Sequence, residues 1–529
     1  MSKPLLNLMR NTKRLKESTF VAPVGGLNLV SSYDNMPPQD AIEMDNYLPK
    51  NNAVELRRGY KEHAKLGIHP RTLAVYQSAT GKDRLFAFGD GRVFEVSKKD
   101  NYQSISVEYL FKMQELGDVY ASDDWQWVQF KEHLFLSNGT DKVQIYAPDE
   151  TDATFGSLSD ANFEGDGFVS EKIMHIFVAK QRLWFVEKNA LRVWYTEQAG
   201  AIQGKVIPFD VGQLSSFAGT LVAGTSWSID GGAGVDDLTC FITSEGETLV
   251  YKGSNPSSSD DWALVGVYKM PKPVGKNPFL KYQGDVILTS FQGYVPLKQA
   301  LLMEKSNVSA LEFGAKIAPL VTKRASFFKS KSGWQAIEYP KGGYILFNVP
   351  LSNGFEQHIY NTSTGAWSRF TGINGESFVL FQDNLYFANK EGVFLFDTGF
   401  QDGNNPICGS IRQAYTCFNN LNEKRVLMLK PNLKATSPFA LQIYTDADFM
   451  LSDLPYQTDI QTPGESYWNN AKWGSLNRGV LGTKWARLVG VQTAHWINNM
   501  AQGVYFSLVL KTKTKSVGVT FYGTGVRYE

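Results

Sequence analysis

The chain has 529 residues, of which 43% are hydrophobic and 13% aromatic, enough to bury a large core in two or more domains. Its 53 Lys and Arg residues nearly balance its 52 Asp and Glu residues, which leaves a formal net charge of +1. This balance argues against a protein that holds nucleic acid tightly, because tight phosphate binding requires a basic surplus. The aromatic residues and the 47 glycines favour an all-β protein with tight turns.

The cysteines and the hydropathy exclude further classes of protein. The three cysteines, Cys240, Cys408 and Cys417, contain no C-x-x-C pair, so neither a disulfide framework nor a thiolate zinc site is predicted. Residues 1–20 are basic but no apolar segment follows them, so they do not read as a signal peptide. No stretch approaches the roughly 18 apolar residues that cross a bilayer. We expect a protein without a membrane-spanning segment that assembles in a cytoplasm.

A hairpin pattern recurs along the chain. Arg84–Val96 reads as two alternating strands around a tight turn at Gly89–Gly91, with glycine where φ must be positive. The same plan returns around Asn138-Gly139, Asn189, Gly246, Gln292, Gly354 and Asn389. The turn centres, from 89 to 389, are on average 50 residues apart. A period near this length with several strands per repeat is typical of a β-propeller, here of six or seven blades.

Further strands and one helix complete the repeats. An additional strand is predicted before most hairpins, at Thr72–Tyr76, Trp125–Phe130, Ile173–Ala179, Phe279–Tyr282 and Ser377–Phe381. Asn361–Phe370 supplies a turn and an outer strand. The best helix candidate is Val308–Ile317, which we expect to end before Pro319 and to form a helical insertion near residues 298–326.

The pattern divides the chain into three parts. Residues 1–62 are predicted to be an extended N-terminal arm with one helical turn at Gln39–Asn46, and residues 63–404 to be the propeller. Asp402–Pro406 reads as a linker. Residues 405–529 are predicted to form a β-sandwich-like domain. Its expected strands are Lys424–Lys430, Phe439–Tyr444, Lys484–Gln492, Tyr505–Thr512 and Val517–Tyr522.

Several short motifs resemble one family of proteins. The segments that carry the resemblance near the N-terminus are Val24–Leu29, Met36–Ala41, Asn46–Pro49 and Val54–Tyr60. They form a glycine-rich opening, Met-Pro-Pro-x-x-Ala, Asn-aromatic-x-Pro and an Arg-x-Gly-aromatic step. Together they resemble the tail hub or nozzle proteins of short-tailed bacteriophages (podoviruses), in which the last step leads into the propeller. Weaker matches are Gly293–Leu297, Lys316-Ile317 and the closing Gly523–Glu529.

The resemblance implies a structural role in the virion. Six copies would form a ring below the portal and adaptor (connector) rings, with tail fibres or spikes docked at its sides. A plug or needle would close the lumen until double-stranded DNA passes into the host, and the ring would assemble in the host cytoplasm. The assembly contacts expected from it are Met36, Pro37, Pro38, Tyr47, Arg57 and Arg58, with Lys13 and Arg14 of the basic tail. That tail, residues 1–20, departs from the family pattern and is expected to be a solvated arm.

Motifs for catalysis are missing from the sequence. It contains no G-x-x-x-x-G-K-[ST], no H-E-x-x-H and no G-x-S-x-G. The histidines lack metal-ligand spacing and are expected mostly at the surface or at blade edges, with His133 packing at the start of a strand. These are His63, His69, His133, His175, His358 and His495. No catalytic, cofactor-binding or metal residue is predicted, and the chain is interpreted as a structural protein and not an enzyme.

Two weaker patterns leave alternatives open. Ser228–Gly232 partly matches the Asp-box turn of sialidase propellers, although Val235 stands where an aromatic residue belongs, and a glycosidase would rest on this match alone. Asp123-Asp124 and Asp236-Asp237 are interpreted as solvated loop caps. Trp125 and Trp127 fit blade packing better than a carbohydrate platform. The second hypothesis is therefore a carbohydrate- or receptor-binding propeller on the phage tail.

Overall fold

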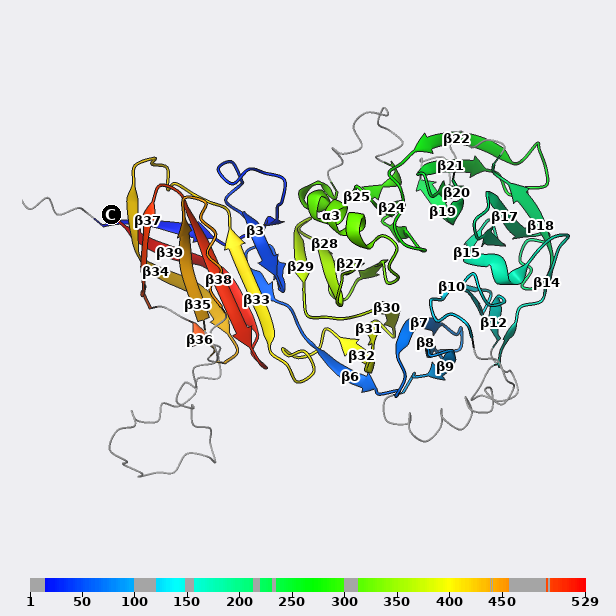
Figure 1. Cartoon of the computed structure of the whole chain (residues 1–529), viewed down its shortest axis with the longest axis horizontal. Helices are drawn as coiled ribbons and strands as arrows, with labels where there is room; N and C mark the ends of the chain where they lie inside the picture. Colours follow the sequence, from blue (N-terminus) through cyan, green and yellow to red (C-terminus); the bar gives the residue numbers. More distant parts are fainter. Residues whose placement is uncertain are drawn as a thin grey trace, which may run out of the picture. The chain divides into compact units, whose positions relative to one another are not determined.

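The computed structural model describes residues 15–98, 120–147, 157–212, 219–230, 235–298, 313–437, 439, 441–455, 491–492 and 495–529. The chain forms two compact units, one made of residues up to Arg57 together with Asn405–Glu529, the other of Arg58–Asn404. Both consist mainly of β-strands (Figure 1), so the predicted all-β class is confirmed. No helix in the described ranges is long and apolar enough to cross a membrane.

The first unit contains strands from both ends of the chain. Its N-terminal strands are β1 (Lys16–Val21), β2 (Gly26–Leu27), β3 (Asp40–Asp45), β4 (Tyr47–Pro49) and β5 (Val54–Leu56). Its C-terminal strands are β33 (Ile407–Gln413), β34 (Lys424–Ala435), β35 (Leu441–Ala447), β36 (Val491–Gln492), β37 (Ile497–Gly503), β38 (Phe506–Thr514) and β39 (Val519–Tyr528). The N-terminal segment is therefore not an arm of its own, because β1 and β5 pair with β39 and β3 pairs with β33.

These strands form two packed sheets. One has the order β36-β34-β39-β5-β4, and the other places β2, β3, β33, β38 and β35 side by side. Tyr47 of β4 joins the sheets through a 2.9 Å hydrogen bond to the Thr512 hydroxyl of β38. Phe418 stacks on both Phe506 and Tyr528, one from each sheet. The helical turn predicted at Gln39–Asn46 is wrong, because antiparallel pairing with β33 holds this segment extended.

The second unit contains seven sheets in chain order (Figure 1). The first sheet contains β7 (Pro70–Tyr76), β8 (Arg84–Gly89) and β9 (Arg92–Glu95), and the second contains β10 (Gln126–Phe130), β11 (His133–Ser137), β12 (Gln144–Ala147) and β13 (Ser157–Asp160). The third contains β14 (Phe163–Glu164), β15 (Ile173–Ala179), β16 (Arg182–Glu187), β17 (Arg192–Thr196) and β18 (Gly204–Asp210), and the fourth contains β19 (Leu221–Asp230), β20 (Val235–Thr243), β21 (Glu247–Lys252) and β22 (Ala263–Lys269). The fifth contains β23 (Phe279–Tyr282), β24 (Asp285–Ser290) and β25 (Gly293–Pro296), and the sixth contains β26 (Gln335–Tyr339), β27 (Tyr344–Pro350), β28 (Phe355–Asn361) and β29 (Trp367–Phe370). The seventh is β30 (Ser377–Phe381), β31 (Asn384–Asn389) and β32 (Gly392–Phe396), completed by β6 (Tyr60–Ala64) from the start of the unit.

The predicted hairpins are confirmed at all seven positions. Each predicted turn centre falls between two consecutive antiparallel strands, from β8 and β9 to β31 and β32. At the first of them Asp90 and Gly91 have φ of 52° and 72°, which lets a two-residue turn follow the twist of its strands. The turns were predictable because this backbone conformation favours glycine, asparagine and aspartate.

The seven sheets follow one another in a closed series. We call β7, β10, β15, β19, β23, β26 and β30 the first strands. Each begins its sheet along the chain, apart from the short β14 before β15 and from β6, which joins the seventh sheet from the start of the unit. First strands contact one another from β10 to β30, and β30 contacts β7. Apolar side chains fill the space between consecutive sheets, as where Tyr76 and Phe86 meet Leu134 and Tyr146. The last sheet packs on the first in the same way, through Val379 and Leu73 among others.

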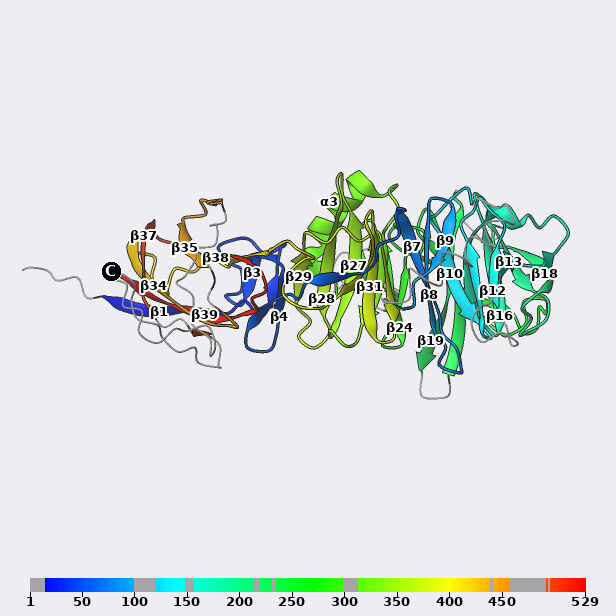
Figure 2. The same cartoon turned by 90° about the horizontal axis from the view of Figure 1, so that it is seen from below.

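The helix differs from its prediction. The short 3-10 helix η4 (Ala315–Ile317) leads into α3 (Ala318–Phe328), which lies at one end of the strands (Figure 2). A second 3-10 helix, η2 (Ser170–Lys172), precedes β15. Pro319 stands in the first turn of α3 and does not end a helix, because N–H groups there have no intrahelical acceptor to lose. The predicted insertion near 298–326 thus contains α3, while residues 299–312 lie outside the described part.

Candidate functional site

Three of the predicted assembly residues are buried inside the first unit. Met36 is 5% exposed, Tyr47 is fully buried and Arg57 is 4% exposed. The Arg57 guanidinium donates a 2.7 Å hydrogen bond from Nε to the Asn46 side-chain oxygen. These side chains therefore hold the chain's own fold together and are not presented on its surface.

The other predicted contacts lie elsewhere. Pro37, Pro38 and Arg58 are exposed, and the Arg58 guanidinium carbon lies 5.1 Å from the centre of the Phe400 ring. Lys13 and Arg14 lie outside the described residues. For the three exposed residues an assembly role remains a prediction.

The Arg-x-Gly-aromatic motif leads directly into the closed series of sheets. Gly59 donates to the Gly399 carbonyl at 3.1 Å and accepts from the Thr398 amide at 3.0 Å. A Cβ atom on Gly59 would lie 1.8 Å from the carbonyl oxygen of Gln401, so this position admits only glycine. From Tyr60 the chain continues as β6 and pairs with β32, so the motif joins the start of the unit to its end.

Side chains of the first strands bond to the backbone of neighbouring sheets. The Gln126 amide donates to the Ile176 carbonyl at 2.8 Å and accepts from the Ile176 N–H at 2.7 Å. Gln335 makes the same pair of bonds to Phe378, at 2.7 and 2.8 Å. Other bonds of this kind join Thr72 to Asp123 and Trp125, His175 to Gly224, and Ser377 to Leu73. No local sequence pattern indicates these long-range bonds. Gln126 lies near the start of a predicted strand, whereas no strand was predicted at Gln335.

A cavity of ≈ 530 Å³ opens where five first strands begin. Its walls come from β7 and from the residues at or just before the starts of β10, β23, β26 and β30. Its charged lining residues are Arg71, Asp124, Lys276, Lys329, Lys331 and Glu376. Its volume lies within the range of about 300–1,000 Å³ that is usual for small-molecule sites, so we treat it as a candidate site.

Positive charge predominates in this cavity. Arg71, Lys276, Lys329 and Lys331 line it together with only two carboxylates, Asp124 and Glu376. Both carboxylates already have cationic or histidine partners. Asp124 pairs with Lys276 at 2.8 Å, and Glu376 lies 2.5 Å from Nε2 of His69.

A buried charged network lies beside α3. Glu356 of β28 binds Arg324 of α3 through both carboxylate oxygens, at 2.6 and 2.9 Å. It also contacts Nε2 of His358 at 3.1 Å and Arg369 at 3.8 Å. Burial would raise the pKa of the Glu356 carboxyl, but hydrogen bonds from His358 and Arg324 outweigh it and lower this pKa to about 2. The network anchors α3 to its sheet.

Two histidines contradict the expected surface or blade-edge placement. His358 is fully buried, and its Nδ1 lies 2.9 Å from the Tyr294 hydroxyl. His175 is 2% exposed and its Nε2 lies 3.0 Å from the Gly224 carbonyl oxygen. Burial lowers the pKa of both, to about 4 for His175. His133 begins β11 as predicted and is half-buried.

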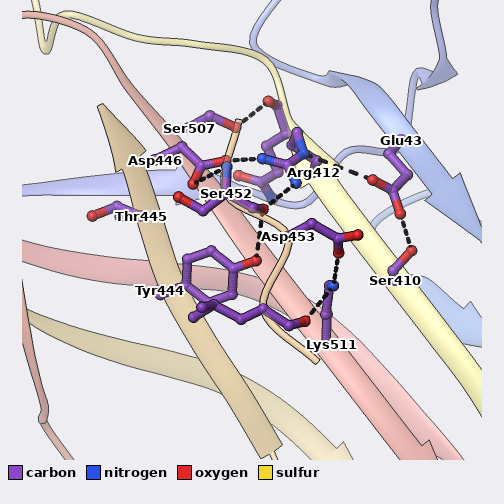
Figure 3. Close-up of polar contacts among 12 residues, drawn as sticks. Glu43, Ser410, Arg412, Tyr444, Thr445, Asp446, Ser452, Asp453, Ser507 and Lys511 are labelled. Atoms are coloured by element: carbon purple, nitrogen blue, oxygen red, sulfur yellow. Dashed lines mark hydrogen bonds and ion pairs between the residues drawn. The ribbon is translucent and has the colours of Figure 1, made fainter. Parts of the chain in front are cut away.

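A second group of charges lies in the first unit (Figure 3). Arg412 of β33 pairs with Asp446 of β35 and lies 3.7 Å from Glu43 of β3. It also donates a 2.8 Å hydrogen bond to the Ser452 carbonyl. Lys511 of β38 binds Asp453 at 2.5 Å. The side chains of Arg412 and Lys511 are only 6% and 5% exposed. Their contacts with the Ser452 carbonyl and the Asp453 carboxylate hold the segment after β35 against the sheet.

The remaining candidate motifs have structural surroundings. Asp123 accepts a 2.9 Å hydrogen bond from the Gly91 amide, as a loop cap does. Trp125 is 5% exposed between two sheets, and Trp127 donates from Nε1 to the Leu73 carbonyl at 2.9 Å, so both rings pack between sheets. Ser228–Asp230 ends strand β19, and residues 231–234 lie outside the described part. Within the described ranges, no three His, Cys, Asp or Glu side chains are grouped to hold a metal ion.

Comparisons with known proteins give no family. No family model matches the chain, and no curated protein matches it. Among solved structures, Chaetomium thermophilum Raptor matches with 11% identity and a TM-score of 0.36. That match covers 67% of this chain and 29% of the Raptor chain, so this chain spans less than a third of Raptor's length.

Proposed function

We propose that this chain is a structural virion protein, a ring subunit of the tail hub or nozzle of a short-tailed bacteriophage. Its second unit would be a seven-bladed β-propeller and its first unit a β-sandwich. Six copies would form the distal conduit through which the genome leaves, beneath an adaptor ring, with fibres or spikes and a plug or needle as further partners.

One observation carries the proposal. The resemblance to the nozzle family includes an Arg-x-Gly-aromatic step into the propeller, and Arg57–Tyr60 occupies that place in this chain. Gly59 fits where a Cβ atom would lie 1.8 Å from the Gln401 oxygen, and Tyr60 begins the strand that completes the seventh sheet. The position of this motif at the joint between the first and last strands of the series supports the proposal.

The arrangement of the sheets supports the propeller. Propeller blades are antiparallel sheets that pack radially because neither face can be buried alone. Here consecutive sheets bury apolar side chains against each other, and the last sheet returns to the first through β30 and β7. A strand from the start of the unit, β6, completes the final sheet, which ties the two ends of the series together.

The proposed mechanism is passive. Function would depend on ring geometry, on the lumen and on docking surfaces, and no chemical step is assigned to any residue. A net charge of +1 suits a conduit, because a strongly basic wall would retain DNA through counterion release.

Native mass spectrometry and negative-stain imaging of the full chain, alone and beside isolated tails, test this proposal. Six-fold rings, or density for this chain on the tail axis beneath the adaptor, are expected. A chain that stays monomeric and is absent from the tail axis would contradict the proposal. A chain that is monomeric in solution yet present on the axis would support it, with assembly templated by the ring above.

The cavity favours a second candidate function, a carbohydrate- or receptor-binding propeller on the tail. Carboxylates, amides and hydroxyls line it, and these groups form the hydrogen bonds that sugar hydroxyls need. A glycan-binding screen with the full chain tests this candidate, and binding that disappears when the cavity residues are changed would support it.

A further inference from the structure

We propose that the cavity at the starts of β7, β10, β23, β26 and β30 binds a sugar acid, meaning a polyhydroxylated ring that carries a carboxylate. This inference goes beyond the tail-ring proposal and rests on the second candidate function, to which it gives a ligand class.

The charges that line the cavity favour an anionic ligand. Four cationic side chains face two carboxylates, and Asp124 and Glu376 are already engaged by Lys276 and His69. Cations of one sign gathered in a concave site raise the local concentration of anions. Arg71 contributes a planar fork that matches a carboxylate, and Lys329 adds a second exposed charge.

The uncharged polar residues of the lining favour a ligand that carries hydroxyl groups. Asn277, Ser330 and Ser332 stand around the cavity, and all three carry groups that donate and accept hydrogen bonds. Asp124 and Glu376 add acceptors for sugar hydroxyls. Trp127, which is half-buried, also lines the cavity, while its ring packs against the apolar cores of the neighbouring sheets. A simple inorganic anion would use the charges and the donors but would bring no ring hydroxyls to the acceptors of the lining.

The walls are held in place without a ligand. Trp334 is 6% exposed and donates from its indole N–H to the Phe328 carbonyl at 3.0 Å. Lys331 donates to the carbonyls of Leu351 and Ser352, at 2.7 and 3.0 Å. Contacts of this kind fix the shape of a site before binding, which lowers the entropy lost when a ligand is ordered.

Calorimetric titration of the full chain with matched sugars tests the inference. Glucuronate and galacturonate are compared with glucose and galactose, which differ from them only at the carboxylate carbon. Both acids should bind, and each neutral sugar should bind at least about tenfold more weakly, as the loss of one charge-assisted interaction predicts. Affinity for the acids should fall as salt is raised.

Variants locate the site. Arg71→Gln and Lys329→Gln should each weaken binding of the acids by about tenfold, whereas Lys390→Gln, an exposed lysine on the turn between β31 and β32, should leave it unchanged. Equal binding of acid and neutral sugars, no binding of either, or acid binding that survives both variants would overturn the inference. Binding of inorganic phosphate or glucose 6-phosphate with the same variant sensitivity, but not of the sugar acids, would also overturn it.

Imaging of the same preparations keeps the two proposals apart. Rings that form normally while the acids fail to bind would reject the sugar-acid site and leave the tail-ring proposal standing. If the chain binds the acids but forms no ring and is missing from tails, the tail-ring proposal is rejected and the sugar-acid site stands.

Discussion

Lys276 and Asp124 form a 2.8 Å ion pair between two sheets that are not neighbours in the closed series. Asp124 precedes β10 in the second sheet and Lys276 precedes β23 in the fifth, so the pair reaches across the opening that the first strands surround. Lys276 also approaches the Asp124 carbonyl oxygen at 3.3 Å. The pair therefore forms part of the cavity wall.

Replacing Lys276 with methionine should have little effect on stability. Both partners are 37% exposed, and water screens such a pair to about 0–1 kcal/mol. The free energy of unfolding of Lys276→Met should therefore fall by no more than about 1 kcal/mol in a urea titration. A loss above about 2 kcal/mol would show that the pair holds the sheets together and does more than line the cavity.

Gln126→Leu should lower the free energy of unfolding much more than Gln129→Leu. Gln126 is 8% exposed, and its loss leaves the Ile176 N–H and carbonyl without these partners in a buried place. Unsatisfied buried groups cost about 1–3 kcal/mol each, so the two groups together should cost about 2–6 kcal/mol.

Gln129 is the matched control for this change. Its amide makes the same two bonds to the backbone of Gln77, at 2.5 and 2.8 Å, but in a solvent-exposed place where water can replace it. Gln129→Leu should lower the free energy of unfolding by less than about 1 kcal/mol. Equal losses from the two substitutions in chemical denaturation would refute a role for burial.

These glutamines show how far the sequence could predict the fold. The turn at Asn189 is encoded locally, because φ of 59° there suits asparagine, and all seven hairpins could be located from such signals. The partner of Gln126 is Ile176, fifty residues away, and no local pattern specifies it. The burial of His358 and the cavity likewise depend on contacts between distant segments. The helical turn predicted in the place of β3 is wrong because β3 is held extended by pairing with β33, whose residues are more than 360 positions away in the sequence.

Gly59→Ala should disrupt the joint between the start and the end of the second unit. The new methyl group would lie 1.8 Å from the Gln401 carbonyl oxygen, which is backbone and must shift, together with the bonds to Thr398 and Gly399. A loss of at least about 2 kcal/mol is expected, with faster exchange of the amide protons of β6.

Gly525→Ala serves as the control for this substitution. A Cβ atom on Gly525 in β39 would have no neighbour closer than 3.7 Å, which is ordinary contact. Its midpoint of unfolding should stay near that of the unchanged chain. If Gly59→Ala is tolerated as well as Gly525→Ala, the close approach at Gln401 is not a constraint on the fold.

His175 should make stability depend on pH between about 6.5 and 4. Burial lowers its pKa to about 4 in the folded chain, so the unfolded chain binds the proton first as the pH falls. Its contribution is fully present above pH 6.5 and is lost as the pH falls towards 4, by up to about 3 kcal/mol. His358, whose pKa is also lowered, acts in the same direction.

Urea titrations at several pH values measure this slope. His175→Gln, which keeps a neutral hydrogen-bond donor, should flatten it, whereas His133→Gln at the half-buried start of β11 should not. An unchanged slope in His175→Gln would place the source of the pH dependence at another residue.

Glu356→Gln should be among the most destabilising single changes in the second unit. The carboxylate is 3% exposed and neutralises Arg324 and Arg369, which would lose their anion inside the protein. Breaking a buried ion pair on one side costs about 3–5 kcal/mol. With a folded pKa of about 2, the contribution of Glu356 is present above its unfolded pKa of 4.5 and is lost as the pH falls from 4.5 towards 2.

Glu17→Gln provides the comparison for this pair. Glu17 binds Arg527 at 2.7 Å, but the two side chains are 61% and 35% exposed, so its removal should cost at most about 1 kcal/mol. Denaturation at pH 7 compares the two variants directly. If the cost of Glu356→Gln is no larger than that of Glu17→Gln, the buried network does not anchor α3, and the helix must be held by its apolar contacts with β25 and β27 alone.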